Sequence, residues 1–174
     1  MIFVGNLAYL PNREATQVLS SVIAPIVLDE IKNAKFLVVG KGRDKLESPG
    51  LMFTGFVENV LDVLNISDVA VAPLFHGTGT RLKILEYLSC GLPVVSTSIG
   101  AEGLETENGV NIFIEDNLES FALRIVELLN NRELSTALGK AARVLAESTY
   151  DWTQITRKLE VNLNRLLSEQ FMKA

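Results

Sequence analysis

The sequence has 174 residues, of which 48% are hydrophobic, so it is long enough and apolar enough to fold as one domain around a core. A formal net charge of −5 without a basic cluster argues against a nucleic-acid partner. The single cysteine excludes an internal disulfide and a cysteine-based metal site, and it favours a reducing, cytoplasmic location. No apolar run reaches the roughly 18 residues that a membrane span requires.

The first two thirds of the chain contain short, continuously apolar runs, which are typical of strands buried on both faces of a parallel sheet. These runs are residues 2–4, 35–40, 51–55, 68–74, 93–97 and 111–114. Helical patterns separate several of them. Asn12 is predicted to cap the first helix, and Pro25 should kink or break it. Residues 58–66 and 80–90 are predicted as the next two helices.

After residue 114 the pattern becomes helical. Asn117 is predicted to cap a helix over 118–131, and Asp151 is predicted to cap the last helix of the chain. Strands that alternate with helices, followed by helices alone, predict a Rossmann-like α/β fold. We expect one domain over 1–174, with a doubly wound parallel sheet of about six strands and a C-terminal helical tail. In such folds a ligand lies outside the carboxyl ends of the strands.

The stretch "VVGKGRD", residues 38–44, is superficially similar to a dinucleotide-binding fingerprint. The third glycine of that fingerprint would fall at Lys45, and no convincing helix starts there. We therefore interpret the stretch as a tight turn after a buried strand, from which Lys41 or Arg43 could contact a ligand.

The stretch "GTGTRLK", residues 77–83, precedes an apolar helix but lacks the spacing of a P-loop. Its glycines would let a ligand approach the backbone, and the first N–H groups of a helix lack partners within the helix. Such a terminus attracts phosphate, and Arg81 would add positive charge. The alternative is an ordinary glycine-rich turn with a solvated arginine.

Glu86 favours the phosphate interpretation. It shares a helical face with Gly79 and Lys83, while leucine and isoleucine occupy much of the remaining surface. A carboxylate in an apolar setting is costly unless it is paired or hydrogen-bonded. It could pair with Lys83, or it could accept bonds from the two hydroxyls of a ribose. The seven residues from Gly79 span about 10 Å, which is the length of a diphosphate plus a sugar.

The same region resembles the nucleotide-binding C-terminal lobe of the GT-B glycosyltransferases, and more closely the retaining group 1, family 4-like type. That family combines a proline after a strand, a glycine loop and the pattern K-x-x-E-x-x-x-x-G-x-P-V-V. The matching residues are Pro73, Gly77, Gly79, Lys83, Glu86, Gly91, Pro93, Val94 and Val95. Weaker similarity extends over nearly the whole chain.

The resemblance implies a nucleoside-diphosphate sugar, such as a UDP or GDP sugar, as the donor substrate, and no metal cofactor. Glu86 would hold the ribose, and the backbone near Phe56 and Val57 would meet the base. Residues around the start of the helix would bind the diphosphate: Gly79, Thr80, Arg81, Leu82 and Lys83. Loop residues before them would lie near the transferred sugar: His76, Gly77 and Thr78.

The sequence departs from the family pattern in two places. Many relatives carry a glutamate eight residues before the one matched by Glu86, whereas this chain has Thr78 there. Many also carry an arginine and a lysine after the opening strand, and here that role could pass to Arg81 and Lys83. No residue is assigned a catalytic role.

Enzymes of this family have two lobes, and the N-terminal lobe binds the acceptor. We expect residues 1–174 to be the donor lobe, with the acceptor lobe supplied by a longer chain or a separate subunit. That other lobe could also contact a membrane peripherally. Alone, the donor lobe should bind nucleotide without turnover, and Trp152 is expected to anchor the last helix on the core. The alternatives are a non-catalytic module that binds a nucleotide sugar or pairs with a partner, and half of a nucleotide-sugar 2-epimerase.

Overall fold

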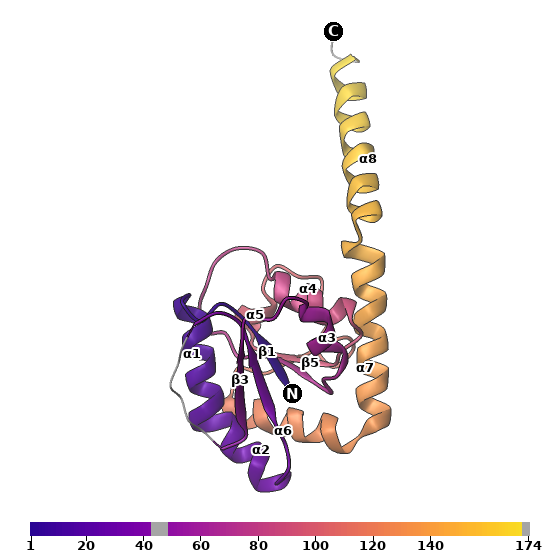
Figure 1. The fold of residues 1–174 in the computed structure, drawn as a ribbon. Helices are drawn as coiled ribbons and strands as arrows, with labels where there is room; N and C mark the ends of the chain where they lie inside the picture. The colour runs from indigo at the N-terminus through magenta and orange to yellow at the C-terminus, as the bar shows by residue number, and fades with distance from the viewer. Residues whose placement is uncertain (43–48, 172–174) are drawn as a thin grey trace.

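The computed structural model describes residues 1–42 and 49–171, which form a parallel sheet covered by helices on both faces (Figure 1). The six strands are β1 (Ile2–Val4), β2 (Phe36–Val39), β3 (Leu51–Gly55), β4 (Ala70–Ala72), β5 (Val94–Ser96) and β6 (Phe113–Ile114). Their order in the sheet is β3-β2-β1-β4-β5-β6, and all pairs are parallel. Each strand lies within a predicted apolar run, so the expected fold class is confirmed.

Two hydrophobic clusters lie on opposite faces of the sheet. The first contains Phe3 and Phe36 of the strands and covers them with α1 (Leu10–Val18), the π-helical turn η1 (Leu19–Ile23), α2 (Ala24–Glu30) and α6 (Leu118–Asn130). The second covers the other face with α3 (Val60–Asn65), α4 (Leu82–Ser89), α5 (Ser98–Ala101) and part of α7 (Arg132–Leu145). Burial on both faces explains why the strands are continuously apolar.

The order of the strands reverses between β1 and β4, which are neighbours in the middle of the sheet. The chain leaves β1 toward α1 on one face, whereas it leaves β4 toward α4 on the other face. The two connections therefore diverge at the carboxyl ends of β1 and β4, and this switch-point region is called the crevice below. Ligands of doubly wound folds bind at this switch point.

The first helix differs from the sequence prediction in its start. It begins at Leu10 with Tyr9 at the cap position, so the prediction that Asn12 caps it is wrong. Asn12 lies inside the first turn, where its side chain is buried and serves a different contact described below. The helix does not break at Pro25: the backbone stays helical, and the π-helical turn η1 interrupts its regular pattern just before the proline. Pro25 then falls in the first turn of α2, where its missing N–H costs little.

The predicted caps of two later helices are confirmed. The side chain of Asn117 accepts a hydrogen bond of 3.0 Å from the Ser120 N–H at the start of α6. The side chain of Asp151 accepts one of 2.8 Å from the Thr153 N–H at the start of α8 (Trp152–Phe171). These bonds satisfy N–H groups that have no partner within the helix.

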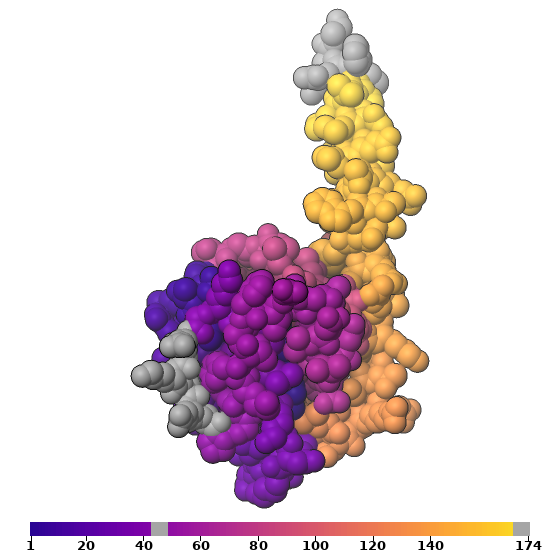
Figure 2. Space-filling model, in the orientation of Figure 1, coloured from indigo at the N-terminus to yellow at the C-terminus, as the bar shows by residue number. Residues whose placement is uncertain are grey.

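The last helix stands away from the body of the molecule (Figure 2). Asp151 has an extended backbone, with φ −62° and ψ 139°, which redirects the chain after the π-helical turn η2 (Ala146–Tyr150). Trp152 is consequently 81% exposed, so the prediction that it anchors this helix on the core is wrong. Over the described residues, no helix combines the length and apolar character needed to span a membrane.

Candidate functional site

The loop between β4 and α4 brings exposed backbone to the crevice. Gly77 and Gly79 have φ values of +135° and +91°, which residues with a side chain rarely adopt. A Cβ atom built on Gly79 would meet no atom within 4 Å, so this part of the loop faces open space. Thr78 and Thr80 are exposed as well. A ligand could therefore reach the backbone here, as the sequence predicts.

The helix that follows starts later than predicted. It begins at Leu82 instead of Thr80, because Arg81 has non-helical dihedrals of −80° and 52°. The Leu82 N–H donates to the Thr80 carbonyl at 2.9 Å, and the Ile84 N–H donates to the Arg81 carbonyl at the same distance. A turn thus occupies the N–H of Leu82, which was predicted to be free for a diphosphate. The side chain of Leu82 is 62% exposed.

Arg81 is buried, so the alternative of a solvated arginine in an ordinary turn is wrong. Only 8% of it is exposed, and its Nη2 donates to Glu102 Oε2 at 2.8 Å and to the Gly77 carbonyl at 3.3 Å. Its Nε is buried and has no hydrogen-bond partner among residues 1–42 and 49–171. The guanidinium therefore ties the glycine loop to the segment that follows α5.

Lys83 points across the crevice toward α1. Its Nζ donates to Asn12 Oδ1 at 2.6 Å and lies 4.3 Å from the centre of the Phe3 ring. Burial of the ammonium group lowers the pKa of Lys83 to about 8, while the nearby Glu86 raises it and Arg81 lowers it further. Lys83 and Glu86 are both described by the structure and form no ion pair, so the predicted alternative of an intrahelical pair is wrong.

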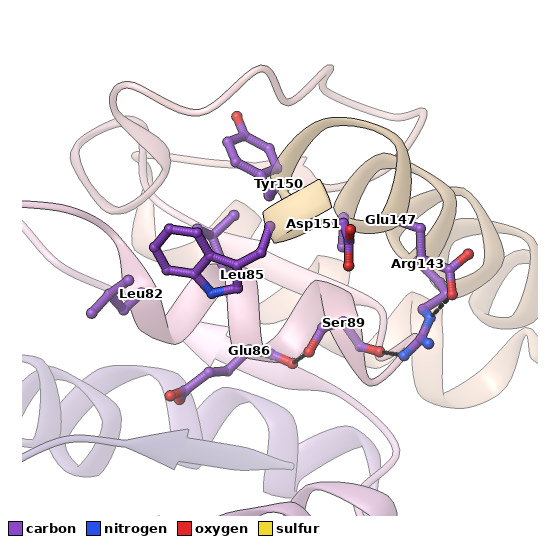
Figure 3. Close-up of a pocket in the computed structure, with 10 residues that line it drawn as sticks. Leu82, Leu85, Glu86, Ser89, Arg143, Glu147, Tyr150 and Asp151 are labelled. Atoms are coloured by element: carbon purple, nitrogen blue, oxygen red, sulfur yellow. Dashed lines mark hydrogen bonds and ion pairs between the residues drawn. The ribbon is translucent and has the colours of Figure 1, made fainter. Parts of the chain in front are cut away.

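Glu86 is exposed, contrary to the apolar setting expected from the sequence. The buried face of α4 consists of Ile84, Tyr87 and Leu88, and Glu86 lies on the opposite side. Figure 3 shows its carboxylate pointing away from Arg143 and Glu147, beside a hollow of about 430 Å³ between α4, η2 and the start of α8. Among residues 1–42 and 49–171, the Glu86 carboxylate has no hydrogen bond or ion pair, so it can accept hydrogen bonds from a ligand.

His76 lies at the same crevice, on the loop before the glycines. Its Nε2 is 2.6 Å from Glu14 Oε2, so it connects this loop to α1. His76 and Glu14 are both partly exposed, with 50% and 37% of their side-chain surface accessible. The structure thus places His76, Gly77 and Thr78 together on the loop between β4 and α4, at the carboxyl end of the sheet.

A separate hollow lies at the carboxyl ends of β1, β2 and β3, where the base was expected. It measures about 240 Å³, and its lining includes Gly5, Lys41, Phe56 and Val57. Phe56 is 64% exposed, and the Lys41 Nζ lies 4.9 Å from the centre of its ring. Arg43, which was also expected near a ligand, lies outside the described residues.

Sequence reasoning missed three partners of the site. Asn12 was interpreted as a cap, and neither Glu14 nor Glu102 was given a role. Asn12 and Glu102 accept hydrogen bonds from Lys83 and Arg81, and Glu14 Oε2 lies 2.6 Å from His76 Nε2. Buried basic groups need hydrogen-bond acceptors, so a search for acceptors in neighbouring segments could have identified these partners.

The side chains at the site determine which kind of ligand it suits. In the part of the chain that the structure describes, no group of three histidine, cysteine, aspartate or glutamate side chains could hold a metal ion. The crevice instead offers backbone of the glycine loop, two basic side chains and one exposed carboxylate. This combination suits a ligand that carries both phosphate and hydroxyl groups.

A family comparison supports this interpretation. The family described as "Glycosyl transferases group 1" matches residues 1–131. This chain belongs to the group 1 glycosyl transferases. Among relatives, it is 31% identical over 147 residues to the sulfoquinovosyl transferase SQD2 of Arabidopsis thaliana, a match that covers 76% of this chain and 28% of that protein.

Solved structures agree on the fold of this group 1 member. The C-terminal domain of a glycosyl transferase group 1 family protein (LpcC) from Francisella tularensis superposes with a TM-score of 0.71 and 16% identity, covering 87% of this chain and 85% of that one. The pneumococcal O-GlcNAc transferase GtfA, solved with UDP and GlcNAc, gives 0.72 and 17%, covering 95% and 35%. The chain thus has the fold of the C-terminal lobe of a GT-B glycosyltransferase. It spans between 28% and 37% of the first curated relatives that it matches.

Proposed function

We propose that this chain is the donor-binding lobe of a glycosyltransferase that binds a nucleoside-diphosphate sugar and passes a hexosyl-type group to an acceptor. The observation that carries the proposal is the exposed carboxylate of Glu86 on the helix that follows the glycine loop, at the switch point of a group 1 family chain. UDP is the first nucleotide to test, because the similar GtfA structure holds UDP.

Each part of the donor has a place in this proposal. The hydroxyls of the ribose donate to Glu86, and the base lies in the hollow at Phe56 and Val57. The diphosphate lies against the open backbone at Gly79 and Thr80, near the ammonium of Lys83. Arg81 supports the loop from beneath, where it is buried and paired with Glu102.

The proposed chemistry is electrostatic. When the glycosyl group leaves, negative charge develops on the diphosphate, and oriented backbone N–H groups and cations stabilise that charge. No side chain of the crevice is proposed as a catalytic acid or base, and no metal ion is proposed. Thr78 stands where many relatives are expected to carry an acid near the transferred sugar, so the stereochemical outcome is not part of the proposal.

The proposal includes a second, acceptor-binding lobe, in the same longer chain or in a separate subunit. Glycosyl transfer requires the donor and the acceptor to be held in the correct relative orientation. One lobe alone does not position the acceptor. The described chain alone should therefore bind nucleotide without transferring sugar. The exposed apolar side chains of α8, discussed below, are the surface that we propose for this lobe.

The proposal is tested by titrating UDP, GDP and ADP into the wild type by calorimetry, followed by Glu86→Ala. We expect one nucleotide to bind and the substitution to weaken it about tenfold, as the loss of a hydrogen-bonded charge predicts. Glu119→Ala is the matched control, since this exposed glutamate lies on α6 at the opposite face.

A modified nucleotide separates the ribose contact from a general charge effect. The 2′,3′-dideoxy form of the nucleotide lacks both hydroxyls, so we expect it to bind the wild type weakly. Because the contact with Glu86 is already missing, we expect Glu86→Ala to bind this form with the same low affinity. If no nucleotide binds, or if Glu86→Ala binds as well as wild type, the assignment is wrong.

One observation favours a second candidate function, a non-catalytic module that pairs with a partner protein. The last helix presents apolar side chains to solvent over most of its length. In this case the chain would form a stable complex with its partner but would show no nucleotide affinity, so the same titration distinguishes the two candidates.

A further inference from the structure

Lys83 connects two helices that lie on opposite faces of the sheet. It belongs to α4, which covers one face, and its ammonium donates to Asn12 of α1, which covers the other. The two residues are 71 positions apart in sequence. Their bond therefore passes over the carboxyl end of the sheet, where β1 and β4 meet and the order of the strands reverses.

The side chain of Asn12 is fixed at both of its polar atoms. It is 7% exposed, its Nδ2 donates to the Asn6 carbonyl at 2.9 Å, and its Oδ1 is thereby turned toward Lys83. It also lies directly on Gly5, where a Cβ atom would be 2.7 Å from the Asn12 Cγ. Only a residue without a side chain at position 5 leaves room for this arrangement.

The charge of Lys83 is held but not neutralised. Below it lies the face of the Phe3 ring, which attracts a cation but carries no charge. Asn12 is the only hydrogen-bond acceptor that the described residues provide for its three N–H groups, and the amide is neutral. By contrast, Arg81 is already paired with the carboxylate of Glu102. Among the described residues, Lys83 is thus the cation of this crevice that has no carboxylate in ion-pair contact.

We infer that Asn12 is a positioning residue for the donor: it holds the amine of Lys83 at the floor of the crevice, where that amine binds the diphosphate. This inference rests on the proposed function, and it adds a residue on the far side of the sheet to the donor site. Without Asn12, the amine would be free to swing toward Glu86 or into solvent, and part of the affinity for the diphosphate would be lost.

The protonation of Lys83 provides an independent readout. Burial lowers its pKa to about 8, so its charge changes in an accessible pH range. Glu86 and Arg81 act on it from its own segment of the chain, and on α1 the nearest acid in sequence, Glu14, is engaged with His76. Because a diphosphate prefers the charged amine, affinity should fall as the pH rises above about 8.

A double-mutant cycle tests whether Asn12 acts through Lys83. UDP affinity is measured by calorimetry for the wild type, Asn12→Ala, Lys83→Met and the double variant. We expect Asn12→Ala to weaken binding about tenfold when Lys83 is present and to have no further effect in Lys83→Met. Equal losses in both backgrounds would overturn the inference, because Asn12 would then act independently of the amine.

A second variant guards against a failure of Asn12→Ala to fold. Asn12→Asp keeps the size and the acceptor oxygen but places a carboxylate beside the amine. We expect the Lys83 midpoint, followed by NMR of the labelled lysine side chains without nucleotide, to rise above its wild-type value of about 8. Asn33→Asp, an exposed site remote from the crevice, adds the same charge and should leave this midpoint unchanged. An unshifted midpoint in Asn12→Asp would contradict the inference.

These readouts separate two kinds of failure. If the wild type binds no nucleotide, the proposed function fails, while the nucleotide-free titration still reports whether Asn12 holds the amine. If the wild type binds UDP and the affinities of the four proteins show no coupling, the proposed function stands and the role of Asn12 is wrong.

Discussion

Two basic residues, two positions apart in sequence, meet very different acceptors in this crevice. Arg81 is paired with the carboxylate of Glu102, whereas Lys83 is held by the neutral amide of Asn12. The first arrangement neutralises a buried charge and fixes a loop, and the second leaves a charge available. The two cations therefore differ in the acceptor that they meet, and we propose Lys83 as the one that faces the ligand.

The structural role of Arg81 gives a prediction for Glu102. Glu102→Ala removes the carboxylate that is 2.8 Å from a guanidinium of which only 8% is exposed, so the buried charge loses its partner. We expect the free energy of unfolding to fall by about 1–3 kcal/mol, as measured by urea denaturation. The wild-type Glu102 carboxylate is itself largely exposed, which places the value in the lower part of this range.

Glu105→Ala is the control for this prediction. Glu105 is also exposed, and its only side-chain ion pair in the described structure is with Lys158 at 4.0 Å. Its substitution should change the free energy of unfolding by less than about 0.5 kcal/mol. Equal effects of the two substitutions would show that the Arg81 contact does not stabilise the loop.

The sequence singled out the charged residues beside the glycine loop, whereas it did not predict their internal partners. Glu86, Arg81 and Lys83 were identifiable because charged residues stand out beside a glycine loop. Asn12 and Glu102 are distant in sequence, and only the crossing of two connections at the switch point brings them to these cations. The helical spacing also placed Glu86 in an apolar setting, because local pattern alone does not define which face of α4 is covered.

One buried contact fixes the position of the helix that carries the site. The hydroxyl of Tyr87 in α4 accepts a hydrogen bond of 2.8 Å from the Val4 N–H at the end of β1. Tyr87 is fully buried, and burial raises the pKa of its hydroxyl, although the bond from Val4 opposes this shift. This bond joins α4 to the strand on the other side of the switch point, so it sets where Lys83 and Glu86 stand.

Tyr87→Phe should therefore destabilise the fold. It leaves the Val4 N–H without its acceptor, which we expect to cost about 1–3 kcal/mol in urea unfolding at neutral pH. Tyr9→Phe, at a tyrosine that is 47% exposed, should have a much smaller effect. If Tyr87→Phe is as stable as wild type, the contact does not hold the helix.

The same tyrosine predicts a pH dependence at alkaline pH. Its pKa in the folded chain lies above its ordinary value of 10.0, so the folded state binds this proton more tightly than the unfolded state does. The stabilisation is present below about pH 10 and is lost as the pH rises further. The free energy of unfolding of Tyr87→Phe should therefore fall less steeply than that of wild type above this pH.

Elements were predictable where a single physical cause determines them. All six strands were found from their apolar runs, because burial on both faces leaves no polar positions. The caps at Asn117 and Asp151 were found because the capping bond is local. The starts of α1 and α4 were not, since turns at Tyr9 and at Thr80 to Leu82 compete with the helices for the same backbone groups.

The shape of the whole molecule is a compact α/β body with one helix that stands clear of it (Figure 1). Apolar side chains with 39–81% exposure recur along α8, and six of them fall within about a third of the helix circumference at 100° per residue. They are Trp152, Ile155, Leu159, Leu163, Leu166 and Leu167. This apolar stripe is the surface that we propose for the acceptor lobe.

The exposure of the stripe gives a prediction for the chain alone. Leu159→Ser combined with Leu163→Ser should leave the thermal midpoint of the α/β body unchanged, because 56% and 51% of these residues are already exposed. The same variant should reduce concentration-dependent self-association in analytical ultracentrifugation. Leu64→Ser, at a fully buried position of α3, is the contrasting control and should destabilise the fold strongly.

A marked drop in the thermal midpoint of the double serine variant would contradict this account. It would mean that α8 folds back on the body in solution. The sequence predicted this helix and its cap but not its direction, because the extended backbone of Asp151 decides the direction and a sequence pattern does not report it.

The central claim is that Glu86 holds the ribose while the open backbone at Gly79 and Thr80, with Lys83, meets the diphosphate. The most direct test is a crystal structure of this chain with UDP bound. The account predicts the Glu86 carboxylate within about 3 Å of both ribose hydroxyls and the Lys83 amine against a phosphate oxygen, still bonded to Asn12. A structure with UDP elsewhere, or with Glu86 turned away from the ribose, would contradict it.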